Sequence, residues 1–198
     1  MRRIFVLKAS TAVTAPIFIL RNIAGTSGRL DIVCRCIINA FLINGRIRRN
    51  VDFYAVLEGP PSPPRLLMVS GELLSHLPKS EVEVARIIRD LLSIGKGSHP
   101  RNEAFKIDRM SFKKLILYLK NEGYSLVYLH ENGVDIRKFN FASLTSTVFI
   151  LGDHLGLDPA SEKFLDSLNI PRISLGPISY LASHCIILVN EELDRLKV

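Results

Sequence analysis

Thr147-Val-Phe-Ile-Leu-Gly-Asp-His-Leu-Gly156 is a short apolar strand that stops at a glycine-bearing turn. Two other stretches have the same form: Leu126-Val-Tyr-Leu-His130, closed by Glu131-Asn132-Gly133, and Arg172-Ile-Ser-Leu-Gly-Pro177, which leads into a helix with Cys185. In α/β proteins, loops at strand ends present backbone amides and carbonyls to a ligand. The three loops therefore predict a pocket whose hydrogen bonds come from the main chain rather than from charged side chains.

Phosphate-binding loops are absent from the sequence, which contains neither GxGxxG nor GxxxxGKS/T. This disfavours cofactors held by a pyrophosphate. A ligand with adenine but no phosphate, such as S-adenosylmethionine, suits the pocket better. The spacing alone leaves a second explanation open, in which Gly152, Gly156 and Gly176 are ordinary turn residues.

Strands alternate with helices along the chain, which predicts an α/β fold with a largely parallel sheet and a single domain over residues 1–198. The segment from Gly95 to Arg109 is polar and basic, and we expect it to be mobile. The expected strands lie at 4–7, 51–57, 65–69, 126–130, from 147 and at 172–175, and the expected helices lie at 28–43, from 80, at 112–122, at 159–168 and after 177. Expected helix caps are Ser80 with Glu83, Ser111, and Asp158 before Pro159.

Two helices carry specific expectations. In the helix at 28–43, apolar residues at helical spacing form one buried stripe, which turns Asp31 and Arg35 to the other side. In the last helix, Cys185-Ile-Ile-Leu-Val189 is apolar on every side, so we expect burial on more than one face. A subunit interface and deep burial within a monomer both explain that pattern.

Positive charge is concentrated near the N-terminus. The chain has a net charge of +7, and residues 1–50 hold nine Lys and Arg against one acid, Asp31, a net +8. A basic face on a nearly neutral body favours a polyanion such as nucleic acid as partner, and a basic surface kept for solubility is the alternative.

The three cysteines have no paired spacing, which favours a reducing compartment and a cytoplasmic protein. Cys34 and Cys36 point in different directions on a helix, so burial explains them better than a metal does. His130, His154 and His184 flank the predicted pocket without metal-ligand spacing. We expect no metal and no membrane segment, since no apolar run reaches the ~20 residues of a membrane helix.

Five segments together carry a family resemblance: Ser27-Gly-Arg-Leu-Asp-Ile-Val-Cys-Arg-Cys36, Ile47-Arg-Arg-Asn-Val-Asp-Phe-Tyr-Ala-Val-Leu57, Leu129-His-Glu-Asn-Gly133, Phe149-Ile-Leu-Gly-Asp-His-Leu-Gly156, and Arg172-Ile-Ser-Leu-Gly-Pro177 with His184-Cys185. They resemble the archaeal tRNA (pseudouridine-54, N1) methyltransferases, members of the SPOUT class of knotted RNA methyltransferases. The sequence departs from that family at Ala104-Phe-Lys-Ile-Asp-Arg109, where an arginine-rich, aromatic segment is expected.

The resemblance implies a SPOUT-like fold with a C-terminal trefoil knot, a homodimer, S-adenosyl-L-methionine as cofactor and tRNA as partner. It implies that the cofactor's adenosyl group is held by main-chain atoms of the strand ends, near Cys185. The implied cofactor residues are Leu129, Gly152, Asp153, Gly156, Ile173, Ser174, Leu175, Gly176, Pro177, Ile178 and Cys185.

For catalysis we predict Asp31, as a proton acceptor or as an acceptor of a hydrogen bond from the base edge, because it is the only acid in the basic region. Two alternatives are open for Asp31: an i,i+4 pair with Arg35, or a favourable position at the N-terminus of its helix. Asp153 is the rival carboxylate unless it caps a turn. Arg29, Arg35, Arg48 and Arg49 are predicted to contact RNA phosphates or a flipped base; each could equally be a plain surface arginine. Rival functions are methylation of ribosomal RNA and a catalytically silent RNA-binding or ribosome-assembly protein.

Overall fold

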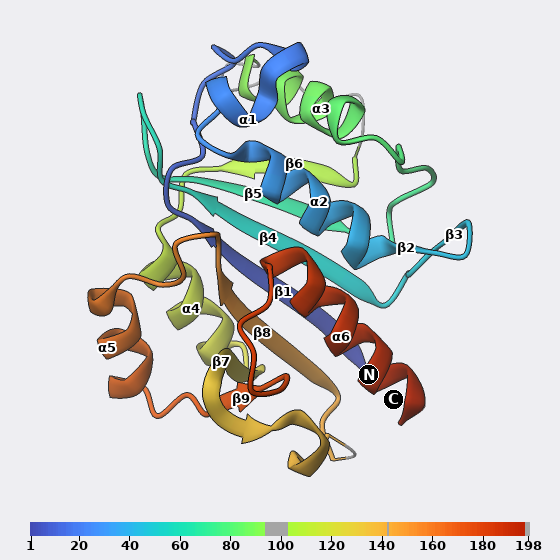
Figure 1. Ribbon diagram of the computed structural model, residues 1–198, viewed down its shortest axis with the longest axis vertical. Coiled ribbons are helices and arrows are strands. Elements are labelled where there is room, and N and C mark those ends of the chain that lie inside the picture. The colour runs from blue at the N-terminus through green and yellow to red at the C-terminus, as the bar shows by residue number, and fades with distance from the viewer. Residues whose placement is uncertain (94–102, 142, 197–198) are drawn as a thin grey trace.

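A seven-stranded sheet in the order β6-β5-β4-β1-β8-β7-β9 runs through the computed structural model (Figure 1), which describes residues 1–93, 103–141 and 143–196. β1 pairs in parallel with β4 and β8, and β7 pairs in parallel with β8 and β9. β5 is antiparallel to β4 and β6. The predicted largely parallel α/β sheet is therefore confirmed. The strands are β1 Arg2–Ala9, β4 Val51–Leu57, β5 Arg65–Ser70, β6 Phe105–Asp108, β7 Ser125–Asp135, β8 Ser146–Gly152 and β9 Arg172–Ser174.

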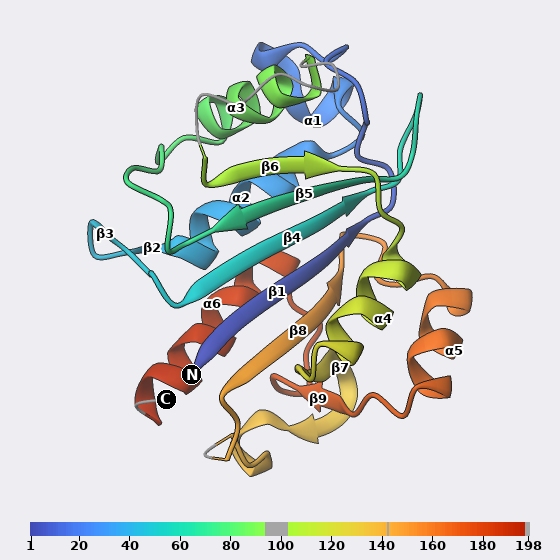
Figure 2. The same ribbon diagram turned by 180° about the vertical axis from the view of Figure 1, so that it is seen from behind.

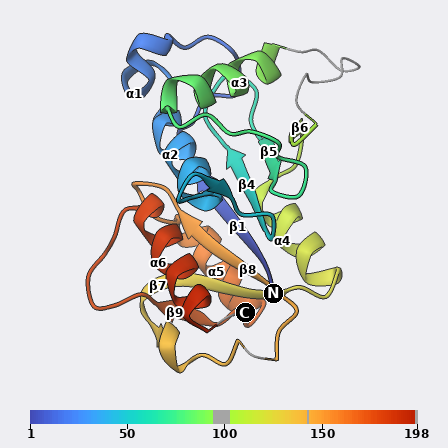
Figure 3. The ribbon, with the colours of Figure 1, turned by 90° about the vertical axis from the view of Figure 1, so that its right-hand side faces the viewer.

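Helices cover both faces of the sheet. α2, α3 and α6 lie on one face (Figure 1), and α4 and α5 lie on the other (Figure 2). Seen from the side in Figure 3, α2 and α6 stand on one side of β1 and α4 on the other. Two short helical turns, η1 and α1, lie in the connection 9–26, and η2 follows β7. The helices are η1 Leu20–Asn22, α1 Ile23–Thr26, α2 Leu30–Phe41, α3 Glu81–Ser93, α4 Phe112–Asn121, η2 Ile136–Lys138, α5 Pro159–Ser167 and α6 Ala182–Arg195.

The strands alternate their side chains between two cores, as the two-residue period of a strand requires. Phe5, Phe53 and Phe149 are fully buried in the core shared with α2, α3 and α6. Val6 and Ile150 lie in the core shared with α4 and α5. The central strands are thus apolar on both faces and buried between two layers of helices.

Several local predictions are confirmed. The Ser111 hydroxyl accepts a hydrogen bond from the Lys114 amide, and Asp158 accepts from the amides of Ala160 and Ser161, so both cap their helices. Cys34 and Cys36 are fully buried.

Among the described residues, no helix is long and apolar enough to cross a membrane.

Two local predictions are wrong. The stretch 131–133 does not close its strand but forms a bulge within β7, after which Val134 and Asp135 pair with β9. Phe105–Asp108, expected in a mobile segment, is strand β6 because it pairs with β5. The last helix lies after Pro177, as predicted, and begins at Ala182. Residues 94–102 of the expected mobile segment lie outside the described residues.

The hairpin after α2 has a local cause. Strands β2 (Leu42–Ile43) and β3 (Arg46–Ile47) are joined by Asn44 and Gly45, which both have positive φ, +46° and +74°. Asn-Gly is the pair that adopts such a turn most readily. The helix therefore stops at Phe41, two residues earlier than the pattern predicted, and the chain turns back into β4.

Candidate active site

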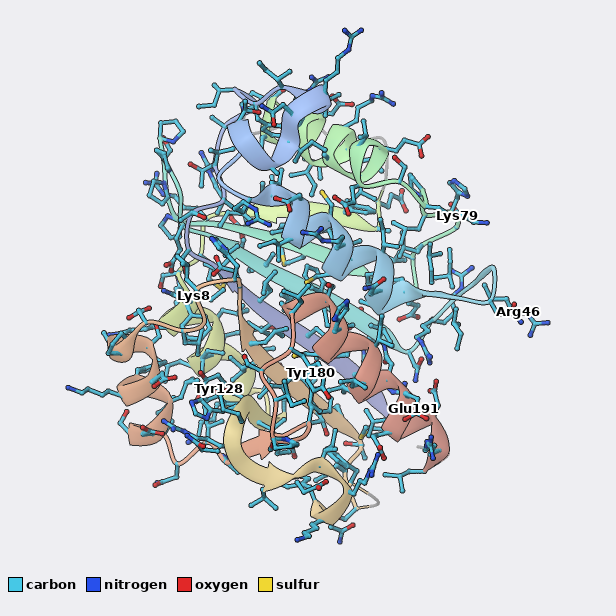
Figure 4. The ribbon with its side chains drawn as sticks, viewed as in Figure 1. Lys8, Arg46, Lys79, Tyr128, Tyr180 and Glu191 are labelled. Carbon is cyan, nitrogen blue, oxygen red and sulfur yellow. The ribbon has the colours of Figure 1, made fainter. Side chains whose placement is uncertain are left out.

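A cavity of about 620 Å³ opens where residues 128–131 in the middle of β7 and the end of β8 meet the loop 175–181. Carboxyl ends of parallel strands share one edge of a sheet, so this placement follows from the topology. Leu129 and His130 come from β7, Gly152 and Asp153 from the end of β8, and Cys185 from the first turn of α6. Figure 4 labels Tyr128 on β7 and Tyr180 in the loop that leads to α6.

Glycine at position 152 allows the main chain to close around the cavity. A Cβ there would lie 2.2 Å from the carbonyl carbon of Gly156, so the two backbones approach more closely than any side chain allows. Gly176 has φ +135°, and the Ser174 hydroxyl both donates to the Gly176 carbonyl and accepts from its amide. The turns at 152–156 and 174–176 are thus held in fixed shapes.

The carboxylate of Asp153 anchors the turn after β8. Its Oδ2 accepts from the Ser10 amide at 2.7 Å and its Oδ1 accepts from the Leu155 amide at 2.9 Å, while the Asp153 amide donates to the Lys8 carbonyl. The side chain is 4% exposed. The turn-capping alternative for Asp153 is therefore confirmed, and the residue also lines the cavity.

Eight of the eleven predicted cofactor residues line the cavity: Leu129, Gly152, Asp153, Gly156, Leu175, Gly176, Ile178 and Cys185. Ile173, Ser174 and Pro177 do not line it; Ile173 and Ser174 are buried, and Ser174 shapes the loop through its hydroxyl. The three predicted flanking histidines, 130, 154 and 184, do line it.

Sequence reasoning missed Tyr128 and Glu162, which together form one wall of the cavity. The Tyr128 hydroxyl donates to Glu162 Oε1 at 2.7 Å, and His130 Nε2 lies 3.7 Å from the same oxygen. Burial and the Glu162 hydrogen bond raise the pKa of Tyr128 above its ordinary range, so the hydroxyl keeps its proton. The only sequence signal for Glu162 is its place one turn into α5, directly after the loop 153–158.

Lys8 ties the cavity's turn to the sheet. Its buried ammonium lies 2.8 Å from Glu58 Oε2 and 2.5 Å from Asp158 Oδ2. Burial alone would lower the pKa of Lys8, but the two carboxylates raise it overall. The hydrogen bonds from Lys8 and Ser161 hold the pKa of Asp158 well below its ordinary value. The two ends of the loop 153–158 are thus fixed by Lys8, through its carbonyl and its side chain.

The structure corrects the orientation predicted for Asp31. The residue is 5% exposed rather than turned to solvent, because Arg29 and Arg35 fold over it. Arg29 forms a bidentate pair at 3.0 and 3.1 Å, and Arg35 donates at 2.6 Å, the i,i+4 pair that the sequence left open. Burial would raise the pKa of Asp31, but the hydrogen bond from Arg29 and the two positive charges lower it overall.

The four predicted RNA-binding arginines do not form one cluster. Arg29 and Arg35 are partly exposed beside Asp31. Arg48 lies just before β4, at the end of the sheet opposite to the cavity. Its side chain is 13% exposed and is paired with Asp194. Arg49 donates to the backbone carbonyl groups of residues 71, 72 and 74. The RNA role of all four stays a prediction, and Arg48 and Arg49 have structural partners.

No described group of three His, Cys, Asp or Glu residues is placed to hold a metal ion. The thiols in this part of the chain are also poor nucleophiles. Burial raises the pKa of Cys34 and Cys36 far above the ordinary value and that of Cys185 to about 11. The cavity therefore offers main-chain hydrogen bonds, carboxylates and imidazoles, arranged to bind and orient a ligand.

Comparison with known proteins gives concordant results. Residues 1–198 match a family model described as "Putative SAM-dependent RNA methyltransferase". Curated relatives named tRNA (pseudouridine(54)-N(1))-methyltransferase include proteins from Methanococcus vannielii, 40% identical over 98% of both chains, and Pyrococcus abyssi, 38% identical over 99% of both. The crystal structure of Archaeoglobus fulgidus Nep1 bound to S-adenosylhomocysteine has the same fold, with a TM-score of 0.66, 16% identity and coverage of 100% of this chain and 99% of that one.

Proposed function

Because this chain belongs to the family of tRNA (pseudouridine(54)-N(1))-methyltransferases, we propose that it transfers a methyl group from S-adenosylmethionine to N1 of pseudouridine 54 in the T loop of tRNA. The whole chain acts as one methyltransferase domain of SPOUT type. The observation that carries the proposal is the cavity between the middle of β7, the turn after β8 and the loop 175–181, where two of the three predicted loops meet.

The cavity fits the cofactor. Its volume of about 620 Å³ lies within the range of small-molecule sites. In the cradle, the turn 152–156, the backbones of Gly152 and Gly156 lie too close together for a Cβ at residue 152, so this side of the cavity is main chain in a fixed shape. Leu129, Gly152, Leu175, Gly176 and Ile178 would hold the adenosyl group, with Cys185 beside it. When bound, the cofactor supplies an electrophilic methyl group.

Pseudouridine offers N1 as an N–H, because its sugar is attached through carbon. The new N1–CH₃ bond forms as the S–CH₃ bond breaks, and the N1 proton leaves as H⁺. A weakly nucleophilic nitrogen therefore needs in-line placement and an acceptor that orients its proton. These are the tasks that the chain's own residues must carry out.

We assign the acceptor role to Asp31. Its lowered pKa supports an ionised carboxylate at neutral pH that accepts a hydrogen bond from the base edge, and it makes the carboxylate a weak proton store. Of the two roles that the sequence left open, this favours orientation over full proton transfer. Arg29 and Arg35, partly exposed beside Asp31, would then contact the backbone of the flipped nucleotide.

Asp31→Asn tests this assignment. The amide keeps the shape of the side chain but loses the charge that holds both arginines. We expect single-turnover methylation to slow by about 10²-fold or more, while the affinity for S-adenosylhomocysteine stays within twofold, because Asp31 does not line the cavity. An unchanged single-turnover rate would remove Asp31 from the reaction.

A homodimer is supported by an apolar surface around the loop 175–181 and α6. Three large apolar side chains within ten residues are exposed here: Ile178 is 63% exposed, Leu181 60% and Ile187 46%. A monomer rarely exposes such a patch without a partner. We propose that a second copy covers it, that the C-terminal segment forms the family's trefoil knot, and that the enzyme works in the cytoplasm.

The function is tested by mass spectrometry of tRNA from cells with and without the gene for this chain, together with methylation of T-loop transcripts that contain pseudouridine. Methylpseudouridine at position 54 should depend on the protein. Methylation of ribosomal RNA instead would favour the rival substrate. A protein that binds RNA but shows no heat with S-adenosylmethionine in titration calorimetry would favour the silent RNA-binding alternative.

A further inference from the structure

The cavity wall is acidic, although the protein as a whole carries a net charge of +7. Glu131, Asp153 and Glu162 line the cavity, and no lysine or arginine is among the described residues that line it. Asp153 accepts two backbone hydrogen bonds, and Glu162 accepts one from the protonated Tyr128 hydroxyl.

Cations just outside the wall are already matched by other acids. Arg172 lies 4.0 Å from Glu162 but pairs more closely, at 3.0 Å, with Asp166. The Lys8 ammonium is shared between two carboxylates, so that cluster is itself negative. Arg29 is held by Asp31. The N-terminus of α6 contributes a partial charge of only about +0.5.

This distribution matters because the donor and the product of methyl transfer differ in charge. S-adenosylmethionine carries a sulfonium, an ammonium and a carboxylate, a net +1. S-adenosylhomocysteine has lost the sulfonium charge and is neutral overall. Contacts to adenine, ribose and the amino-acid group are common to both ligands and cancel in the ratio of their affinities. The electric field of the acidic residues therefore affects this ratio only through the sulfonium charge.

We propose that the carboxylate wall formed by Glu131, Asp153 and Glu162 makes this cavity selective for the charged methyl donor over its neutral product. The inference rests on the proposed function and adds a regulatory property to the same site. Loss of the methyl group removes the attraction, so the product is released more readily and inhibits the enzyme less. Glu162 carries most of the effect that can be tested, because Asp153 also holds the turn and Glu131 is more exposed.

The test is calorimetric titration of the whole protein with three probes: S-adenosylmethionine, S-adenosylhomocysteine and sinefungin, in which a protonated amine replaces the sulfonium. Glu162→Gln keeps the shape of the side chain and removes its charge. Glu122→Gln is the matched control, since Glu122 is exposed at the end of α4 and does not line the cavity. Thermal unfolding of each variant checks that it is folded.

We expect Glu162→Gln to weaken S-adenosylmethionine and sinefungin by about 3- to 10-fold and S-adenosylhomocysteine by less than twofold. Added salt should reduce the preference for the charged ligands in the parent protein. The control should leave all three affinities unchanged.

Two outcomes would overturn the inference. If Glu162→Gln weakens charged and neutral ligands equally, the residue contributes contacts rather than charge selectivity. If the substitution changes the affinity for neither kind of ligand, the charge of Glu162 does not act on the ligand. In both cases the ligands still bind and the proposed function stands. If the parent protein binds none of the three probes, the proposed function itself fails.

Discussion

Gly152→Ala should disable the proposed cofactor site through the main chain alone. The added Cβ would lie 2.2 Å from the carbonyl carbon, 2.5 Å from the oxygen and 2.6 Å from the Cα of Gly156. Ordinary contact begins near 3.4 Å, and all three atoms are backbone, so no side chain can rotate away. The turn after β8 must therefore move outward by about an ångström, which distorts the cradle that Asp153 and Lys8 hold in place.

The expected cost is about 1–3 kcal/mol in the free energy of unfolding, as for other overpacked sites. The affinity for S-adenosylhomocysteine should fall by at least about tenfold, equivalent to ~1.4 kcal/mol. Urea unfolding measures the first quantity, and calorimetric titration under conditions where the variant is fully folded measures the second.

Gly71→Ala is the matched control. A Cβ at residue 71 would lie 2.4 Å from the backbone oxygens of Arg48 and Val51, a similar overlap at the opposite ends of the strands. We expect comparable destabilisation with ligand affinity within twofold of the parent. Equal loss of affinity in both variants would mean that Gly152 acts only through global stability. Unchanged affinity in Gly152→Ala would refute the close-packed cradle.

Three further predictions concern charge and protonation. The hydrogen bonds from Lys8 and Ser161 hold the pKa of Asp158 below its ordinary value. The stability that they contribute is therefore present above about pH 4 and is lost as the pH falls toward the folded-state pKa. Urea unfolding between pH 7 and 3 should show this decline in the free energy of unfolding, and Asp158→Asn should make the decline smaller. Partial burial raises the pKa of Cys185 to about 11, so alkylation of the folded protein by iodoacetamide should speed up about tenfold per pH unit from 7.5 to 9.5; a rate independent of pH would contradict the raised pKa. Arg35→Ala should weaken tRNA binding and reduce its salt slope by about one contact, whereas Arg48→Ala should mainly lower the melting temperature because Arg48 pairs with Asp194; the reverse pattern would reassign the two arginines.

The sequence by itself determined the alternation of strands and helices, the caps at Ser111 and Asp158, and the two glycine-bearing turns, after β8 and after β9, that line the cavity. These are local properties, since hydrophobic period, capping side chains and glycine turns act over a few residues. It also determined the family, because motifs scattered along the chain match in combination.

Only the tertiary structure decided which side chains meet. Glu162 approaches Tyr128 across 34 residues, and Arg48 finds Asp194 across 146. Asp31 is buried because Arg29, in a left-handed conformation at φ 68°, folds back over it. The bulge at 131–133 depends on pairing with a strand that comes some forty residues later. Such contacts depend on how segments that are far apart in the sequence pack together. A pattern that repeats every two to four residues carries no information about which distant segments meet.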